Sequence, residues 1–289
     1  MLFPLLASGR LTTPDGAQIP YIQIGEGPLP VVLILGVNDG LDTVDMLTTT
    51  PLLTWLYSSR ARSQRLLCLS RRQPIPPGYR VEQHAEDLLW ALKQLQWGPT
   101  VVEGLSAGGP IAQWMAVKGP DLVRGLILSS CPHYANEHTQ ALCHSWIGQA
   151  QRGEWAALRW SLAYYTFTPN YWLEILDPFA KTFWPCALVG PFLDPIRKPR
   201  YPERVERLVA PLLSQDNRSI LPTIGCPTLV IGGEEDRVID ASVQREMARL
   251  IPNSRLKIYP GYGHGNSFVN PDYPREVERF LREVIAPTR

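Results

Sequence analysis

The sequence predicts an α/β fold, in which a mostly parallel central sheet is covered by helices on both faces and carries an inserted, mainly helical segment. Short aliphatic and β-branched runs alternate with stretches of helical periodicity along most of the 289 residues. The continuous apolar run at 31–35 (VVLIL) is typical of a strand buried on both faces. The alternation stops at residue 133 and resumes after residue 222, which indicates an insertion into one sheet-based unit.

The expected elements can be read in chain order from their periodicity and turn residues. Pro14-Asp15-Gly16 predicts the turn of a hairpin between 11–15 and 19–24. Pro51 must lie near an end of the helix expected at 43–57, or else kink it. Further strands are expected at 31–35, 66–69, 100–102, 123–129, 227–231 and 255–259, and further helices at 81–95, 111–116, 242–250 and 274–285.

The domain division follows from the interruption. Residues 1–132 and 223–289 form the expected sheet-based core, and 133–222 form the insertion. Between His133 and Tyr201 lie 14 of the 27 Phe, Trp and Tyr residues. These aromatic side chains either line an apolar pocket or pack the insertion onto the core.

Composition excludes several classes of partner. A net charge of +1 without a basic run gives no electrostatic basis for binding nucleic acid or an anionic membrane. No apolar run reaches membrane-spanning length, and the first residues lack a basic signal-peptide region. Five scattered cysteines without a C-x-x-C pair favour free thiols and argue against zinc. We expect a cytoplasmic monomer or homodimer without a metal or other cofactor.

Residues 100–118 contain the motif that indicates chemistry. Gly104-Leu105-Ser106-Ala107-Gly108 is a G-x-S-x-G pentapeptide between an expected strand and an expected helix. Glycines allow the sharp turn, which exposes the Ser106 hydroxyl at a helix N-terminus. Such a turn could also hold a phosphate, but neither G-x-x-x-x-G-K-[ST] nor G-x-G-x-x-G is present. We therefore expect Ser106 to be a nucleophile.

A serine nucleophile needs a base, and His264 is the best placed of five histidines. It lies in the glycine-rich loop 260–265, directly after an expected strand, although a simple turn role is the alternative. The other histidines are expected in packing, surface, loop or insertion roles: His84, His133, His138 and His144.

The acid that orients the base is expected after the strand 227–231. Asp236 is our choice, with a salt bridge to Arg237 as its alternative role. Glu234 and Glu235 are expected to face solvent, and Asp240 to cap the next helix.

A tetrahedral intermediate needs fixed N–H donors for its oxyanion. The backbone N–H of Ala107, at the start of the helix, is the first candidate. Val37, in the loop after the strand 31–35, is the second, because Gly36 allows close backbone approach. Gly36 could also be an ordinary loop glycine.

Together these motifs resemble those of the α/β-hydrolase superfamily. The resemblance rests on 104–108, on 233–238 and on Gly263-His264, in the order Ser, Asp, His. It implies Ser106 as nucleophile, Asp236 as acid and His264 as base, with oxyanion donors at Val37 and Ala107. It also implies that 133–222 is a lid over the site.

This resemblance implies a serine hydrolase that cleaves a small-to-medium apolar ester, thioester or lactone through an acyl-enzyme. C–C bond hydrolases, acyltransferases and haloperoxidase-like members share the same residues, so these activities remain alternatives. A non-catalytic receptor or signalling protein on this fold is a further alternative.

The sequence departs from the family at two loops. Many relatives carry His-Gly where this chain has Leu35-Gly36, and many carry Asp where it has Ser70. Basic residues follow the expected strand 66–69 and also occur late in the insertion. They are expected to be solvated surface charges, with an anionic substrate group as the alternative partner. They are Arg71, Arg72, Arg197, Lys198 and Arg200.

Overall fold

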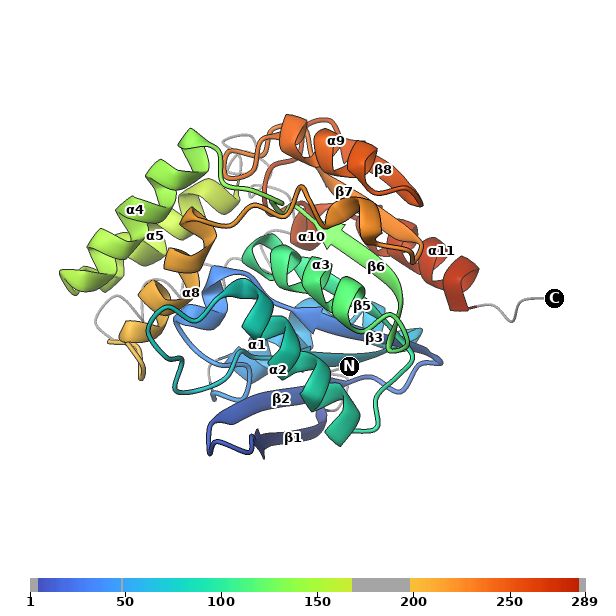
Figure 1. Ribbon diagram of the computed structural model, residues 1–289, viewed down its shortest axis with the longest axis horizontal. Coiled ribbons are helices and arrows are strands. Elements are labelled where there is room, and N and C mark those ends of the chain that lie inside the picture. The colour runs from blue at the N-terminus through green and yellow to red at the C-terminus, as the bar shows by residue number, and fades with distance from the viewer. Residues whose placement is uncertain (1–4, 48, 168–197, 286–289) are drawn as a thin grey trace.

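The computed structural model describes residues 5–47, 49–167 and 198–285, which contain one eight-stranded sheet (Figure 1). Its order is β1-β2-β4-β3-β5-β6-β7-β8. β1 and β2 form the N-terminal hairpin, and β2 also pairs antiparallel with β4, whereas the remaining pairs are parallel. The strands are β1 (Leu5–Thr12), β2 (Gln18–Ile24), β3 (Leu29–Ile34), β4 (Gln64–Leu69), β5 (Thr100–Leu105), β6 (Val123–Ser129), β7 (Thr228–Gly233) and β8 (Ser254–Tyr259).

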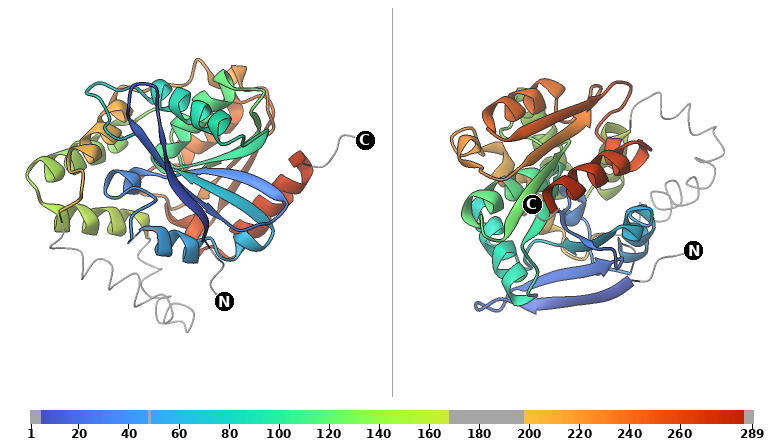
Figure 2. Two further views of the ribbon diagram at one scale, coloured as in Figure 1. Left: turned by 90° about the horizontal axis from the view of Figure 1, so that it is seen from below. Right: turned by 90° about the vertical axis from the view of Figure 1, so that its right-hand side faces the viewer.

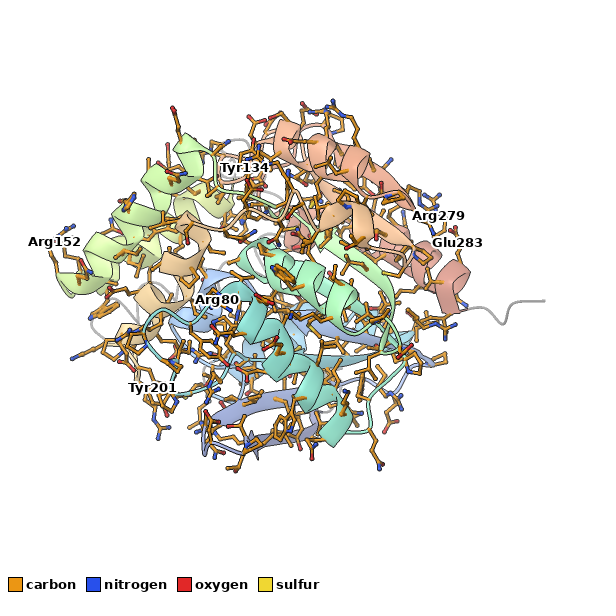
Figure 3. The ribbon with its side chains drawn as sticks, viewed as in Figure 1. Arg80, Tyr134, Arg152, Tyr201, Arg279 and Glu283 are labelled. Atoms are coloured by element: carbon orange, nitrogen blue, oxygen red, sulfur yellow. The ribbon has the colours of Figure 1, made fainter. Side chains whose placement is uncertain are left out.

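Helices cover both faces of this sheet, as the sequence predicts. α2 (Val81–Gln94), α3 (Gly109–Lys118) and α9 (Ala241–Leu250) pack on one face. α1 (Thr49–Leu56) and α11 (Tyr273–Ile285) lie on the other (Figure 2). Each face therefore has its own hydrophobic core. Arg279 and Glu283 project from the outer side of α11 (Figure 3). The predicted fold class is therefore confirmed.

The helix expected at 43–57 is shorter than predicted. α1 begins at Thr49, which places Pro51 in its first turn. A proline has no N–H to donate, and the first turn of a helix is where that donor has no partner in any case. Residues 44–47 form turns instead, and the hydroxyl of Thr50 in α1 donates to the carbonyl of Val44 at 2.7 Å.

The predicted insertion between β6 and β7 is helical where it is described. It contains α4 (Glu137–Gln151), α5 (Trp155–Thr166) and α8 (Glu203–Leu213), which lie beside one another at one side of the sheet (Figure 1). Its middle part, 168–197, lies outside the described residues. Trp146 and Trp155 are buried in the core, whereas Trp160 and Tyr164 are 40% and 52% exposed. Packing thus accounts for part of the aromatic content.

A buried ion pair lies on the α11 side of the sheet, at the strand that leads to the serine. Arg60 donates to the two carboxylate oxygens of Glu103 at 3.0 and 2.6 Å, and the Tyr273 hydroxyl donates at 2.9 Å. Both ionic side chains are at most 4% exposed. We expect Glu103→Gln to lower the free energy of unfolding by about 3–5 kcal/mol, because it leaves the Arg60 charge buried without a counter-charge.

Urea unfolding of the parent and the variant measures this difference. The matched control is Glu283→Gln, which removes a carboxylate that pairs with Arg255 at 2.8 Å on the surface. Exposed pairs contribute little, so the control should unfold at nearly the parent midpoint. Equal effects of the two substitutions would contradict the assigned importance of burial.

Candidate active site

The strand order brings four loops to one edge of the sheet. β3, β5, β6, β7 and β8 are parallel neighbours, so their carboxyl ends lie side by side. Ser106 follows β5, Asp236 follows β7 and His264 follows β8, while Val37 follows β3. Residues far apart in the chain therefore meet where ligands bind in open α/β sheets.

Ser106 occupies a strained turn between β5 and α3. Its φ is +50°, a left-handed conformation that is unusual for a residue with a side chain. The flanking glycines are needed for close approach. A Cβ on Gly104 would lie 2.6 Å from the Cα of Gly109, and a Cβ on Gly108 would lie 2.1 Å from the carbonyl oxygen of Ile34. The sequence therefore permits the serine to stand at the tip of the turn.

We expect Gly108→Ala to destabilise the fold by more than 2 kcal/mol, roughly the scale of strong overpacking, and to lower Ser106 reactivity. Gly108 has a φ of −79°, so the penalty comes from the collision with β3 and not from backbone angles. Thermal melts and the rate of active-serine labelling measure both effects. Gly225→Ala is the matched control, because a Cβ there has no heavy atom within 4 Å. A Gly108 variant as stable as this control would contradict the packing argument.

Ser106, His264 and Asp236 form a continuous chain of hydrogen bonds. The Oγ of Ser106 lies 2.9 Å from Nε2 of His264, and Nδ1 of His264 lies 3.0 and 2.9 Å from the two oxygens of Asp236. An ionised carboxylate only accepts hydrogen bonds, so the arrangement favours a proton on Nδ1. Nε2 then presents a lone pair to the serine hydroxyl, as a general base requires.

Asp236 is held in place by the backbone of its own loop. Its Oδ1 accepts the N–H groups of Val238 and Ile239, both at 2.9 Å, and its side chain has no exposed surface. Arg237 does not pair with this carboxylate but donates to the carbonyl of Phe167 at 3.1 Å. The salt-bridge alternative for Asp236 is therefore wrong.

The competing carboxylates have the positions predicted for them. Glu234 and Glu235 are exposed, and Glu234 pairs with Arg245. Asp240 caps α9, where its side chain accepts the N–H of Ser242 at 2.7 Å. Of these four acids, only Asp236 contacts His264.

The other histidines lie away from the serine. His84 is buried in α2, and His133 is buried with its Nε2 3.7 Å from Glu246. His138 contacts the carbonyl of Arg237 at 2.7 Å, and His144 is exposed on α4. Of the surface and packing roles expected for His84, its burial agrees with packing.

The two predicted oxyanion donors lie in two neighbouring 3₁₀ turns, one of which contains the serine. Val37 is the first residue of the 3₁₀ turn η1 (Val37–Gly40), and Ala107 is the second residue of η3 (Ser106–Gly108). N–H groups at the start of a helical turn have no partner within it. A Cβ on Gly36 would lie 3.0 Å from Cβ and 3.4 Å from Oγ of Ser106, so the glycine is needed for this contact. The donor role of both N–H groups stays a prediction.

The C-terminal end of α5 is hydrogen-bonded to the loop that carries His264. The N–H of Gly265 donates to the carbonyl of Thr166 at 2.7 Å. The guanidinium of Arg237 also lies over the ring of Tyr164, 4.4 Å from its centroid. The insertion thus contacts the segments that carry both the base and the acid.

The sequence-based interpretation of two arginines is wrong. Arg71 and Arg72 are 1% and 7% exposed, although solvated surface charge was expected. Lys198 and Arg200 are exposed as predicted, and Arg197 lies outside the described residues. Arg72 bonds Tyr79 at 3.1 Å and pairs with Asp15 near the N-terminal hairpin. These guanidinium groups pair with Asp39 and Asp15 from other segments of the chain, which local composition does not reveal.

Sequence reasoning also missed a buried charge cluster formed by Asp39, Arg71 and Arg204. Arg204 of α8 donates to Oδ2 of Asp39 at 2.8 Å, to its carbonyl at 2.7 Å and to the carbonyl of Arg71 at 2.9 Å. Burial alone would raise the pKa of Asp39, but the charges of Arg204 and Arg71 outweigh it and hold that pKa below its usual value. A sequence signal existed, because Arg204 shares one face of α8 with Leu208 and Leu212.

Within the described ranges, no group of three His, Cys, Asp or Glu side chains is arranged to hold a metal ion. The helices described there are also too short or too polar to cross a membrane.

Comparisons with known proteins agree with this architecture. The 2-hydroxymuconate semialdehyde hydrolase of Pseudomonas putida is 28% identical over 218 residues, which cover 71% of this chain and 69% of that protein. The non-heme chloroperoxidase CPO-A1 of Kitasatospora aureofaciens is 38% identical over 60 residues, only 20% of each chain. A thermophilic esterase from Thermogutta terrifontis superposes with a TM-score of 0.74 over 96% of this chain and 99% of its own, at 21% identity.

The model of the alpha/beta hydrolase family matches residues 47–280, which include β4 through most of α11 and all three residues of the hydrogen-bonded chain. The sheet order, the helices on both faces and this match lead to one conclusion: the chain belongs to the alpha/beta hydrolase family.

Proposed function

We propose that this hydrolase is a serine hydrolase, which cleaves a small-to-medium apolar ester, thioester or lactone through an acyl-enzyme. The observation that carries the proposal is the chain from Ser106 Oγ through His264 to Asp236, with each link at 2.9–3.0 Å. A hydroxyl, an imidazole with a free Nε2 and a buried carboxylate are the groups that acyl transfer requires.

In the proposed reaction, Ser106 attacks the substrate carbonyl while His264 takes its proton at Nε2. Asp236 stabilises the resulting imidazolium through Nδ1–H. The N–H groups of Val37 and Ala107 donate to the oxyanion of the tetrahedral intermediate. When the intermediate collapses, His264 gives its proton to the leaving group, and an acyl-Ser106 ester remains. Water activated by His264 then releases the acid and restores the serine.

The insertion is proposed to act as the lid of this site. Two contacts of the insertion support this role: Thr166 bonds the loop of the base, and Phe167 bonds Arg237 in the loop of the acid. The aromatic content of 133–222 supports an apolar acyl group as the ligand, because aromatic side chains commonly line pockets for such groups.

Hydrolysis of a C–C bond is the second candidate. It is favoured by the similarity to a hydrolase of 2-hydroxymuconate semialdehyde over 71% of the chain. The same three side chains would serve it, with a carbon leaving group protonated in place of an alcohol.

Fluorophosphonate labelling with peptide mapping, followed by assays on p-nitrophenyl esters, a thioester, a lactone and a vinylogous diketone, tests the proposal. A Ser106 adduct with turnover of the oxygen or sulfur esters supports it. An adduct with turnover of the diketone alone would favour C–C hydrolysis. Folded protein without an adduct or turnover would favour a ligand receptor and reject the enzymatic assignment.

A further inference from the structure

Arg71 lies on the far side of the oxyanion loop from the serine. The sheet order places β4 and β5 on either side of β3, so the residues that follow these strands flank Gly36. On one side, Gly36 lies against Ser106, as the 3.0 Å approach of its would-be Cβ shows. On the other side, the Nη1 of Arg71 donates to the carbonyl oxygen of Gly36 at 3.2 Å.

The carbonyl of Gly36 and the N–H of Val37 belong to one peptide group. A hydrogen bond to the oxygen of a peptide draws electron density from its nitrogen and makes the N–H a stronger donor. The Gly36 oxygen also accepts the N–H of Asp39 at 3.3 Å, so two donors fix the plane of this peptide. One of them carries a full positive charge.

We propose that Arg71 is a positioning residue that orients and polarises the Gly36–Val37 peptide, so that the Val37 N–H binds the oxyanion more strongly. This inference rests on the proposed serine hydrolase function. It assigns to a buried guanidinium a role that acts through the backbone, with no contact between Arg71 and the substrate.

The surrounding charges favour such an effect. Asp39 accepts from Arg71 at 3.4 Å and from Arg204 at 2.8 Å, so the cluster contains two cations and one anion. All three side chains are at most 1% exposed, where water and salt screen charge poorly. Burial, and then the charges of Arg71 and Arg204, hold the pKa of the adjacent His84 well below its usual value, so His84 adds no charge. The cluster thus places a net positive charge on the carbonyl side of the Gly36–Val37 peptide.

The remaining contacts of the cluster hold Arg71 in a fixed position relative to the loop after β3. Ser70 donates its hydroxyl to Asp39, and the N–H of Arg71 donates to the same carboxylate at 3.0 Å. Arg204 donates to the carbonyls of Asp39 and Arg71, one on each loop. Gly40 lets η1 approach α8, because a Cβ there would lie 3.1 Å from the Cα of Val205.

The test measures the acidity of an oxyanion bound at the site. A trifluoromethyl ketone labelled with ¹³C at its carbonyl adds Ser106 to form a hemiketal, whose ionisation is followed by NMR across pH. Removing a whole oxyanion donor costs about 10²–10³ in rate, so weakening one should make the hemiketal about tenfold less acidic in Arg71→Met. The kcat for a p-nitrophenyl ester should fall by a similar factor, while KM changes less than about twofold.

Arg71→Gln keeps a neutral donor at this position and decides the question if the methionine variant does not fold. Its hemiketal should also be less acidic than that of the parent, whereas Arg71→Lys should recover most of the parent value. The matched control is Arg72→Met, which removes a neighbouring buried guanidinium that bonds Tyr79 and Asp15 and not Gly36. That control should leave the hemiketal acidity unchanged.

Each outcome is decisive. Parent-like acidity in a folded Arg71→Met or Arg71→Gln protein overturns the inference while leaving the serine hydrolase proposal intact. Equal changes in the Arg71 and Arg72 variants also overturn it, because they indicate general loss of packing. A parent protein that forms no hemiketal and hydrolyses no ester overturns the proposed function and, with it, the role of Arg71.

Discussion

Ser106→Ala is expected to lower kcat for ester hydrolysis by about 10⁴–10⁶-fold. The hydroxyl that lies 2.9 Å from Nε2 of His264 is lost, so no covalent intermediate can form. A residual rate above that in water would come from binding and from the oxyanion donors, which stay in place. Stopped-flow or discontinuous assays with p-nitrophenyl butyrate measure the loss over this range.

The matched control is Ser129→Ala. Ser129 ends β6 and pairs with Leu105 across the sheet, so it is a buried serine at the neighbouring strand end without a contact to His264. We expect its kcat to stay within about threefold of the parent value, since it leaves every proposed catalytic group unchanged. Thermal melts of both variants exclude unfolding as the cause. If Ser106→Ala turned over the ester at the rate of this control, the nucleophile would have to be another residue.

Asp236→Asn should lower kcat by about 10³–10⁴-fold with little change in KM. An asparagine amide can donate to Nδ1, which stabilises the imidazole tautomer with its proton on Nε2. That tautomer cannot accept the proton of Ser106, and the imidazolium also loses its counter-charge. Because the backbone N–H groups of Val238 and Ile239 can still bond the amide oxygen, the loop should keep its geometry.

Two nearby carboxylates serve as controls for this substitution. Asp240→Asn keeps an effective cap on α9, because asparagine and aspartate are about equally good at that position. Glu235→Gln alters an exposed side chain. Both variants should retain parent kcat. A large loss in either of them, or a parent rate in Asp236→Asn, would reject Asp236 as the orienting acid.

The fold class was predictable because it depends on local signals. Aliphatic runs such as 31–35 fit strands buried on both faces, and the structure has β3 there, between two parallel neighbours. Local position also distinguishes Asp236 from Glu234 and Asp240. In the turn after β7, Asp236 accepts the N–H groups of Val238 and Ile239, whereas Asp240 caps α9.

The sequence by itself determined how strands and helices follow one another along the chain. It also determined the glycine-flanked serine turn and the candidates for nucleophile, base and acid. Only the tertiary structure decided which charges pair with one another in the interior. Arg204 and Asp39 are 165 residues apart in the chain, and no periodicity of either segment indicates that they pair. Arg71 is likewise buried beside Asp39, which belongs to the loop after β3. A charge can be buried only where such a partner is supplied, and here the partner comes from another segment of the chain.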